Sequence, residues 1–344
     1  MKQILAIMLL ISAGLLQAAP DPAQIELQNI NRQLQELRTK KETEKAAELM
    51  KTTARNPKMY PRVRVEMYRN LLSQTSRWQE AEALLKESLS AFPDAETRMR
   101  LYGTMMGRSG YLFHKDRLTA GQAIVEMAEK DPALSSEQKL NILLDFAGRH
   151  MRSVSAREVY GKLRAYPLPV KLEKGTVFSY TRLLSDYAVR RTVSWVSEPT
   201  PAGYEDACRI LTDGIGQLEG DARLQLQILK GQYLRKLGKY REAEDLAADC
   251  LNGNPSMPFE RKSSLIAIRA GCLLDQEKFQ EAYDLYGTIG DGKEMRPHYE
   301  ERAKAAMALG NYPETLRLLE LYQKYNRPPR SFAPRFNHVK SLVH

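Results

Sequence analysis

The residues from Gly287 to Lys293 have the glycine and lysine spacing of a phosphate-binding loop. In such loops a Ser or Thr follows the Lys and holds magnesium, whereas here the next residue is Glu294. The segment also follows an expected helix rather than a strand, so its backbone amides would not be aimed at a phosphate group. The sequence therefore predicts no nucleotide site here.

The sequence also contains no motif for metal binding or for a catalytic nucleophile. The five histidines are dispersed, and no two stand four residues apart as in a helical zinc protease. No nucleophilic Ser or Cys is paired with a nearby base. We therefore predict no catalytic residue, no metal ligand and no cofactor. Because carboxylates are abundant on the expected helices, an exported helical enzyme that acts on glycans through two carboxylates remains the alternative.

A short motif recurs along the chain: an aromatic residue, then a carboxylate two positions later and a small residue three positions later. The copies begin at Trp78, Tyr204, Tyr240, Phe279 and Tyr312, and their small residues are Ala81, Ala207, Ala243, Ala282 and Thr315. The last four copies begin 36, 39 and 33 residues apart. This is the period of two antiparallel helices with their turns, so the motif predicts stacked helical hairpins.

The residue types in the motif have a physical reason. Packed helices come within about 8 to 10 Å of each other only where the side chain at their crossing is small. The aromatic residue lies one turn earlier on the same face and fills the space near the hairpin turn. Gly238 and Gly310 each precede the aromatic residue by two positions, where a helix C-cap favours positive φ. Prolines at 57, 93, 132, 167 and 255 end the expected second helices.

The stretch Leu237–Ala243, with Ala247, Cys250 and Pro255 after it, resembles the second half of a tetratricopeptide repeat. Gly231 stands where the first helix of that family carries its Gly, and the unit around Trp78 repeats the pattern. The last two units depart from this pattern: Ile289 replaces an Ala, and Thr315 replaces the Ala at the helix crossing. The resemblance implies an all-α fold, a right-handed α-solenoid of about seven to eight hairpins.

The expected helix ends divide the chain into six segments. We expect a signal peptide at 1–18, an N-terminal cap or degenerate hairpin at 19–57, partly degenerate repeats at 58–167, a hairpin with inserted Pro-rich loops at 168–220, repeats at 221–328 and a basic tail at 329–344. The inserted loops, 168–178 and 197–203, either carry recognition residues or act as spacers.

In the family that the chain resembles, the first helices of the hairpins line a concave groove that receives a peptide or an extended segment. The positions carried over from the resemblance are Glu66 and Asn70, Gln232 and Arg235, and Glu300 and Lys304. A mixed polar groove suits a protein or peptide partner better than a small molecule. We expect both basic side chains to be exposed, so that reversing Arg235 and Lys304 together changes the free energy of unfolding by less than about 0.5 kcal/mol.

The N-terminus has the features of a secretory signal peptide. Met1–Gln3 carries one Lys, residues 4–16 are apolar or small, and Ala18 and Ala19 offer a cleavage site. No Cys follows the site, so a lipoprotein is not expected, and the mature chain should begin at Ala19. We therefore predict a periplasmic or secreted scaffold with a role in bacterial envelope assembly. A retained anchor or a buried first helix is the alternative.

The chain is basic, with a formal net charge of +10 and a pI near 9.3. An exported protein rarely meets nucleic acid, and the basic residues are scattered, so we predict no nucleic-acid partner. A peripheral contact with an anionic envelope surface stays open. No acidic residue follows Glu320, and the tail alternates basic residues with Phe332 and Phe336. It could dock on an anionic surface, fray, or wrap over the last hairpin as a strand.

The three cysteines are too few to form a disulfide framework for a chain of this length. Cys208, Cys250 and Cys272 all fall among apolar helix residues, where small side chains are expected. We predict free thiols. A bridge between Cys250 and Cys272 is the alternative, because their helices are neighbours in the expected hairpins.

Overall fold

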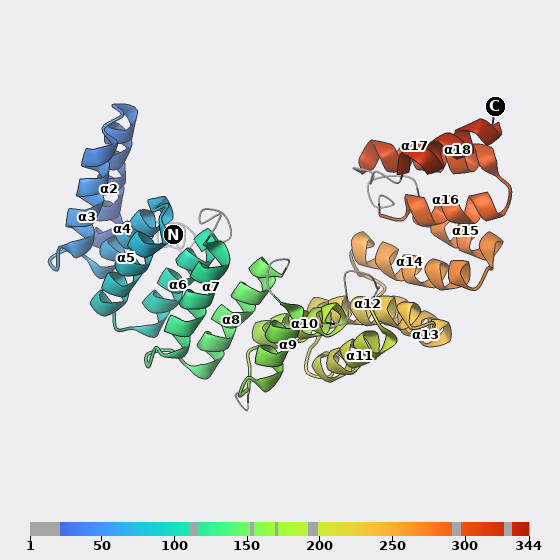
Figure 1. The fold of residues 1–344 in the computed structure, drawn as a ribbon, viewed down its shortest axis with the longest axis horizontal. Helices are drawn as coiled ribbons and strands as arrows, with labels where there is room; N and C mark the ends of the chain where they lie inside the picture. Colours follow the sequence, from blue (N-terminus) through green and yellow to red (C-terminus); the bar gives the residue numbers. More distant parts are fainter. Residues whose placement is uncertain are drawn as a thin grey trace, which may run out of the picture. The chain divides into compact units, whose positions relative to one another are not determined.

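A computed structural model describes residues 21–109, 116–151, 155–168, 171–191, 199–290, 297–326 and 332–343, and within these ranges the regular structure is entirely α-helical (Figure 1). The expected signal peptide lies outside the described residues, as do residues 169 and 170, 197 and 198, and 291–293. No described helix is both long enough and apolar enough to span a bilayer. Contacts within the chain divide it into two units, Met1–Ser153 and Val154–His344.

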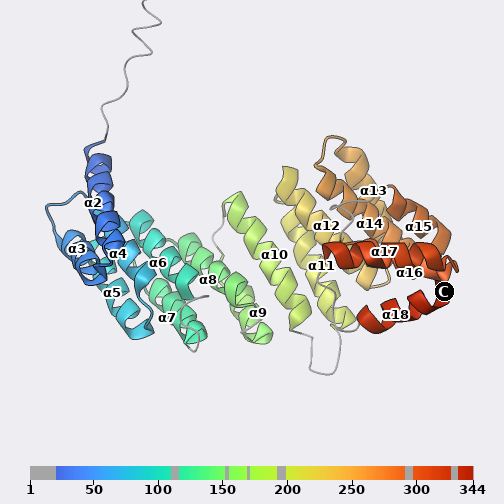
Figure 2. The same ribbon diagram turned by 90° about the horizontal axis from the view of Figure 1, so that it is seen from above.

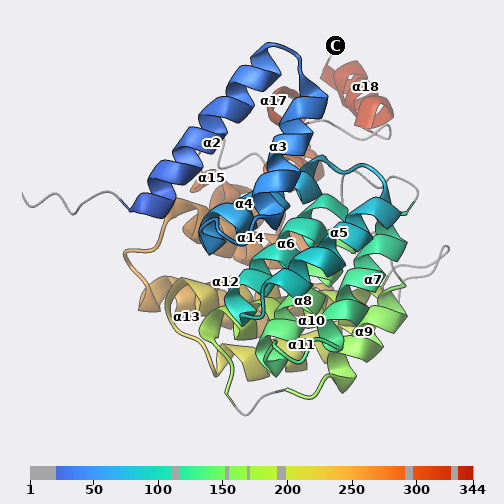
Figure 3. The same cartoon turned by 90° about the vertical axis from the view of Figure 1, so that its left-hand side faces the viewer.

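In the first unit each helix packs against the next along the chain. The first helices of successive hairpins also pack together, α2 on α4, α4 on α6 and α6 on α8. Figure 3 shows α2 and α3 side by side, as expected of a hairpin. The helices of this unit are α2 (Pro22–Thr39), α3 (Thr43–Arg55), α4 (Pro61–Gln74), α5 (Trp78–Ala91), α6 (Ala95–Ser109), α7 (Arg117–Glu129) and α8 (Ser136–His150).

Within the second unit, too, the first helices of successive hairpins pack together. Figure 2 shows α10, α11 and α12 side by side, and α10, α12, α14 and α16 pack on one another in sequence as the first helices of their hairpins. The helices of this unit are α9 (Ala156–Ala165), α10 (Lys174–Arg190), α11 (Pro201–Ile215), α12 (Gly220–Lys236), α13 (Tyr240–Gly253), α14 (Phe259–Asp275), α15 (Phe279–Gly287), α16 (Tyr299–Ala308), α17 (Tyr312–Tyr325) and α18 (Phe332–Val343).

The recurring motif marks the second helix of five hairpins, α5, α11, α13, α15 and α17. Its aromatic residue is the first residue of α5, α13, α15 and α17, whereas Tyr204 lies inside α11 because that helix begins at Pro201. The small residue is buried in every copy, and Ala81, Ala207, Ala243 and Ala282 have no exposed surface. The prediction that these side chains sit at the close helix crossings agrees with this burial.

The hairpin turns use the left-handed backbone region that the sequence predicts. Gly238 and Gly310 both have φ of +73°. Glu277 stands at the equivalent position before Phe279 and also has positive φ, 60°, although it is not a glycine. The turn geometry is therefore retained where the glycine is missing, at a cost of roughly 1 to 2 kcal/mol for a residue with a Cβ atom.

A second recurring feature joins neighbouring helices: a carboxylate that accepts hydrogen bonds from both a Tyr hydroxyl and an Arg guanidinium. We call each one a Tyr–carboxylate–Arg cluster. In four of them the carboxylate stands at least 15 positions from both partners, and among these only Asp206 is also the carboxylate of a motif copy. These four are Tyr68–Glu87–Arg55 and Tyr102–Asp131–Arg98 in the first unit, and Tyr160–Asp206–Arg191 and Tyr286–Glu301–Arg235 in the second. In a fifth, Glu314 accepts from Tyr283 and from Arg317 of its own helix.

The cluster at Asp131 is the most buried in the first unit, with 3% of the Asp side chain exposed. Arg98 donates to one carboxylate oxygen, and the Tyr102 hydroxyl donates to the other at 3.1 Å. Arg98 also donates to the backbone oxygens of Leu89 and Phe92 at the end of α5. One arginine thus fixes the α5–α6 turn to the segment after α7.

The C-terminal tail differs from the prediction. Residues 332–343 form the helix α18, which packs against α17, rather than a frayed end or a strand. Phe332, Phe336, Val339 and Val343 follow a helical spacing of three to four residues, and Phe332 and Val339 are buried. The apolar stripe explains why the tail folds as a helix on the last hairpin.

The cysteines are free, as predicted. Cys250 and Cys272 are buried in one apolar cluster between α13 and α14. Burial raises the pKa of the Cys272 thiol to about 12, so it stays protonated and behaves as a small apolar side chain.

Replacing Asp131 with Asn should lower the free energy of unfolding at pH 7 by about 3 kcal/mol, because Arg98 would stay largely buried without its counter-charge. Burial alone would raise the pKa of Asp131, but the hydrogen bonds from Arg98, Ala133 and Tyr102 lower it below its usual value. Its stabilising effect is therefore complete above the unfolded carboxyl pKa of about 3.9 and is lost as the pH falls through the lower folded value.

Urea unfolding of the wild type and Asp131→Asn, measured from pH 7 to pH 2.5, checks this prediction. The difference in the free energy of unfolding between the two proteins should become smaller below about pH 4. The matched control is Glu96→Gln, since Glu96 pairs with Arg100 on one helix and its side chain is 79% exposed. If Asp131→Asn loses no more free energy of unfolding than Glu96→Gln, the Asp131 cluster does not stabilise the fold as described.

Candidate binding groove

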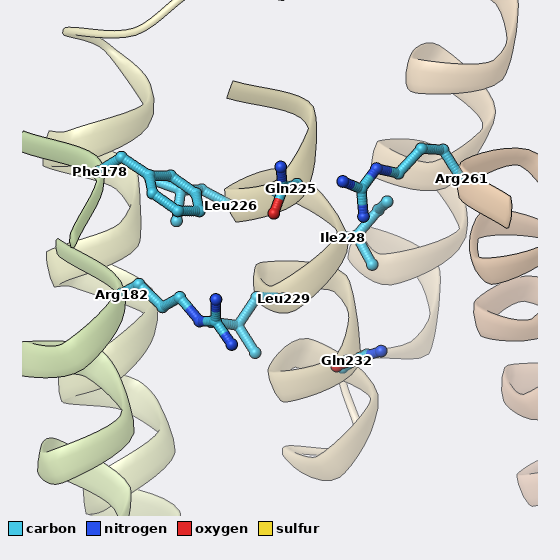
Figure 4. Close-up of a pocket in the computed structure, with 8 residues that line it drawn as sticks. All are labelled: Phe178, Arg182, Gln225, Leu226, Ile228, Leu229, Gln232 and Arg261. Atoms are coloured by element: carbon cyan, nitrogen blue, oxygen red, sulfur yellow. The ribbon is translucent and has the colours of Figure 1, made fainter. Parts of the chain in front are cut away.

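A small cavity lies between three first helices of the second unit (Figure 4). Its volume is about 190 Å³. Figure 4 shows Arg182 reaching from α10 toward Leu229 of α12, with Arg261 extending from α14 on the other side. The lining residues are Phe178, Arg182, Gln225, Leu226, Ile228, Leu229, Gln232 and Arg261.

A second cavity, of about 400 Å³, shares Gln232 with the first. It is bounded by α11, α12, α14 and the start of α16. Its lining residues are Tyr204, Gln232, Tyr233, Arg235, Lys236, Ser264, Ala267, Ile268, Pro297, His298 and Glu301. We refer to the two cavities together as the groove. Most of its surface comes from first helices, as the resemblance implied.

One face of α12 forms the floor of the groove. Gln225, Leu229, Gln232 and Lys236 recur at intervals of three to four residues, which places them on the same side of the helix. Gln232, predicted from the sequence to face a partner, is exposed there. Within the described ranges its side-chain amide makes no hydrogen bond, so both its donor and its acceptor are available to a ligand.

Arg235 lies in the groove wall but is not a free, exposed charge. Its side chain is 16% exposed, and its guanidinium donates to both carboxylate oxygens of Asp275, at 2.6 and 3.1 Å. A third donor lies 2.9 Å from Oε1 of Glu301. The expectation that Arg235 is exposed is therefore wrong, because two carboxylates from α14 and α16 surround it. The arginine ties three first helices together.

A glycine makes room for this arginine. A Cβ atom at Gly271 of α14 would lie 2.1 Å from Nη1 of Arg235, well inside van der Waals contact. The guanidinium therefore crosses α14 over a residue that must lack a side chain. Gly271 was not singled out in the sequence. Gly271 stands four residues before Asp275 on the same helix, so both face the same neighbour. This spacing was the available signal in the sequence.

The aromatic side of the groove is also fixed. The Tyr286 hydroxyl donates to Oε2 of Glu301 at 2.7 Å, and the Tyr286 ring stacks on His298. Burial lowers the pKa of His298, with Arg235 adding to the effect and Glu301 opposing it. The imidazole is therefore neutral at pH 7, and its ring contributes an apolar wall.

The charges that remain free in the groove are positive. Arg261 is neutralised by Asp221, whose two carboxylate oxygens accept from it at 3.0 and 3.2 Å. In the described part of the chain, the side chains of Arg182 and Lys236 have no hydrogen-bond or ion-pair partner, and both are exposed. The groove thus offers two unpaired cations near the apolar side chains of Leu226, Ile228 and Leu229.

The other predicted residues lie elsewhere. Glu66 and Asn70 are on α4 of the first unit, where Glu66 accepts from Arg69 and lines a cavity of about 440 Å³ together with Glu96. Glu300 and Lys304 line a third cavity in the second unit, next to α18. The structure thus brings Gln232 and Arg235 into one groove, and it places Glu300 with Lys304 in a separate cavity. Among the described residues, no three His, Cys, Asp or Glu side chains are placed to hold a metal ion.

Reversing the charge of Arg235 should destabilise the fold rather than leave it unchanged. Arg235→Glu would place three carboxylates together, so we expect a loss of at least about 3 kcal/mol in the free energy of unfolding. Lys304→Glu is the matched control, because Lys304 is 54% exposed and should change stability by about 0.5 kcal/mol or less. Denaturant unfolding of both variants measures the difference. If Arg235→Glu and Lys304→Glu were equally stable, Arg235 would not be bound by Asp275 and Glu301 as described.

Comparison with known proteins supports the fold alone. No protein-family model matches the chain, and no curated protein matches it in sequence. Among solved structures, the apo form of the quorum sensor NprR from B. thuringiensis is similar over 94% of both chains, with 15% identity and a TM-score of 0.52. A tetratricopeptide repeat protein from Parabacteroides merdae aligns over 91% of this chain and 98% of its own, with 12% identity and a TM-score of 0.42.

The tetratricopeptide domain of P58(IPK) aligns over 92% of this chain and 88% of its own, with 14% identity and a TM-score of 0.31. The last two scores are too low to support an argument. The recurring motif, the packed helix pairs and the likeness to NprR agree with one another. The chain therefore has a tetratricopeptide-like helical-repeat fold.

Proposed function

We propose that the chain is an exported scaffold that binds an extended protein or peptide segment in the groove of its second unit. The observation that carries this proposal is the exposed, unpaired amide of Gln232, which lies between the first helices beside the apolar side chains of Leu226, Ile228 and Leu229. An extended segment needs hydrogen-bond partners for its backbone and apolar surface for its side chains, and this groove offers both.

The apolar part of the groove is well placed for side chains of a partner. Ile228 and Ile268 come from neighbouring helices, and Tyr204 packs on Tyr233 with ring centroids 5.5 Å apart. The Tyr233 hydroxyl is already held by Asp186 at 2.7 Å, so the ring keeps a fixed position. Rigid aromatic rings lose little entropy on binding, which favours them at protein interfaces.

The free cations suggest the charge of the partner. Arg182 and Lys236 would attract carboxylates. Arg261 is neutralised by Asp221, and Arg235 with its two carboxylates carries a net charge of −1, so the groove keeps a net positive charge. A segment with acidic residues fits this groove better than a basic one. Nucleic acid is not the proposed partner, since the cations are few and lie near apolar side chains rather than in a basic stripe.

The rival function is a glycan-acting enzyme, which needs two converging carboxylates. Glu66 and Glu96 line one cavity of the first unit, and this pair is the nearest approach to such a site among the described cavities. The Glu96 side chain is 79% exposed, however, and lacks the apolar surroundings that keep a catalytic acid protonated. The groove therefore supports binding better than this cavity supports catalysis.

Export and an envelope setting are part of the proposal. They rest on the apolar run at residues 4–16 and the small residues that follow it. The net charge of +10 would favour a peripheral contact with an anionic envelope surface. Oligomeric state does not enter the proposal, because a single chain contains the whole groove.

Blocking the groove should weaken capture of the partner from an envelope fraction. The double variant Gln232→Trp with Lys236→Glu adds bulk over the floor and reverses one free cation, and a loss of at least about tenfold in affinity is expected. The matched control is Gln280→Trp with Lys278→Glu, at exposed positions outside the groove. Capture that falls equally with both variants, or with neither, would contradict the groove as the binding site.

The N-terminus of the exported protein should be Ala19. Cleavage after Ala18 is favoured because cleavage one residue later would place Pro20 directly after the broken bond. Edman sequencing of protein recovered from the exported fraction measures this directly. Recovery with Met1 intact would contradict the signal peptide, and recovery only from the cytoplasm would contradict export.

A further inference from the structure

A third cavity, of about 320 Å³, lies at the C-terminal end of the second unit. It is bounded by one face of α16, by α17 and by α18, which are labelled together in Figure 1. We call it the C-terminal cavity. Its lining residues are Glu300, Ala303, Lys304, Met307, Thr315, Leu319, Phe332, His338 and Val339.

The cavity forms where α18 covers only part of α16. Each earlier first helix of this unit packs against the first helix of the next hairpin, as α14 packs against α16. After α17 there is one helix, α18, and it packs against α17 through Phe332 and Val339. The face of α16 that carries Met307 is therefore covered only in part, and 41% of the Met307 surface is exposed.

Five of the nine residues that line this cavity are apolar, and the polar ones are Glu300, Lys304, Thr315 and His338. The one wall hydroxyl, that of Thr315, already donates to the backbone oxygen of Asn311 at 2.8 Å. A peptide backbone placed against the apolar residues would lose its hydrogen bonds to water without replacement, whereas an alkyl chain has none to lose. This part of the cavity therefore differs from the groove, where the Gln232 amide is available.

The polar part of the cavity lining contains the ion pair of Lys304 with Glu300 and the side chain of His338. Lys304 is 54% exposed and contacts Glu300 at 3.5 Å, an exposed ion pair of the kind that contributes little and can be exchanged for another partner. His338 lies at the rim of the cavity, and Lys340 is exposed on α18. No acidic residue follows Glu320 in the sequence. An anionic group that takes the place of Glu300 would meet Lys304 of α16, with the imidazole of His338 from α18 beside it.

We propose that the C-terminal cavity binds a single-chain anionic amphiphile, of the class of medium-chain aliphatic carboxylates. The alkyl chain lies against Met307, Leu319 and Phe332, and the carboxylate lies at the rim beside Lys304 and His338. This site is separate from the groove and does not depend on the function proposed for it.

Isothermal titration calorimetry of the full chain with octanoate and decanoate, below their micelle concentrations, tests the site. We expect saturable binding of one molecule, with decanoate tighter by roughly fifteenfold, since each buried methylene contributes about a fourfold gain. Decyltrimethylammonium has the same chain with the opposite charge and should bind at least about tenfold more weakly. Absence of saturable binding, or equal binding of both head groups, would overturn the proposal.

Two variants locate the site within the protein. Met307→Trp should obstruct the cavity and Lys304→Glu should repel the carboxylate, each weakening decanoate binding at least about tenfold. Their matched controls are Leu309→Trp, at a residue with the same 41% exposure that does not line the cavity, and Lys262→Glu, at an exposed lysine of α14.

The controls should leave decanoate binding unchanged, and thermal melts should show that all four proteins fold. Lys304→Glu alters an exposed residue, so it remains informative even where Met307→Trp unfolds the last hairpin. Equal losses in variants and controls would place the amphiphile elsewhere on the chain and overturn the assignment.

Discussion

The close crossing of paired helices at a fully buried small side chain is the constraint on which the rest of this structure depends. Ala243 has no exposed surface, and neither do its counterparts in the other motif copies that end in Ala. A larger side chain there would push the axes beyond the distance at which successive hairpins stack. Stacking in turn brings α10, α12, α14 and α16 next to one another, and their shared surface is the groove.

Within that frame, the Tyr–carboxylate–Arg clusters hold particular helices in place. Those at Asp131 and Asp206 bury a carboxylate, which is costly unless the partners and the hydrogen bonds are complete. The Asp206 cluster joins three elements of the second unit, with Tyr160 on α9, Asp206 on α11 and Arg191 at the C-terminal end of α10. Removing one partner leaves the others buried and unpaired, so these clusters specify which helices are neighbours more than they add to stability.

The parts of the fold that the sequence predicts are those set by nearby residues. Ala243 and Gly238 stand in one hairpin turn, and the types required at their positions follow from local geometry. The environment of Arg235 was missed because Asp275 and Glu301 are 40 and 66 residues away, and only packing brings them together. The helix α18 could have been found from the spacing of Phe332, Phe336 and Val339, but the prediction rested on the alternation of basic and aromatic residues.

The two candidate sites of the second unit show how one architecture provides two kinds of chemistry. Between complete hairpins, a first helix meets another first helix, and polar side chains such as Gln232 remain on the shared surface because water reaches it. At the end of the repeats, α18 must cover apolar surface without a partner hairpin, and its stripe of Phe332 and Val339 does so against α17. The part of α16 that α18 leaves uncovered carries Ala303 and Met307, so the cavity beside it is largely apolar. Partial coverage by one helix thus gives an apolar cavity, whereas contact between first helices gives a groove with polar side chains.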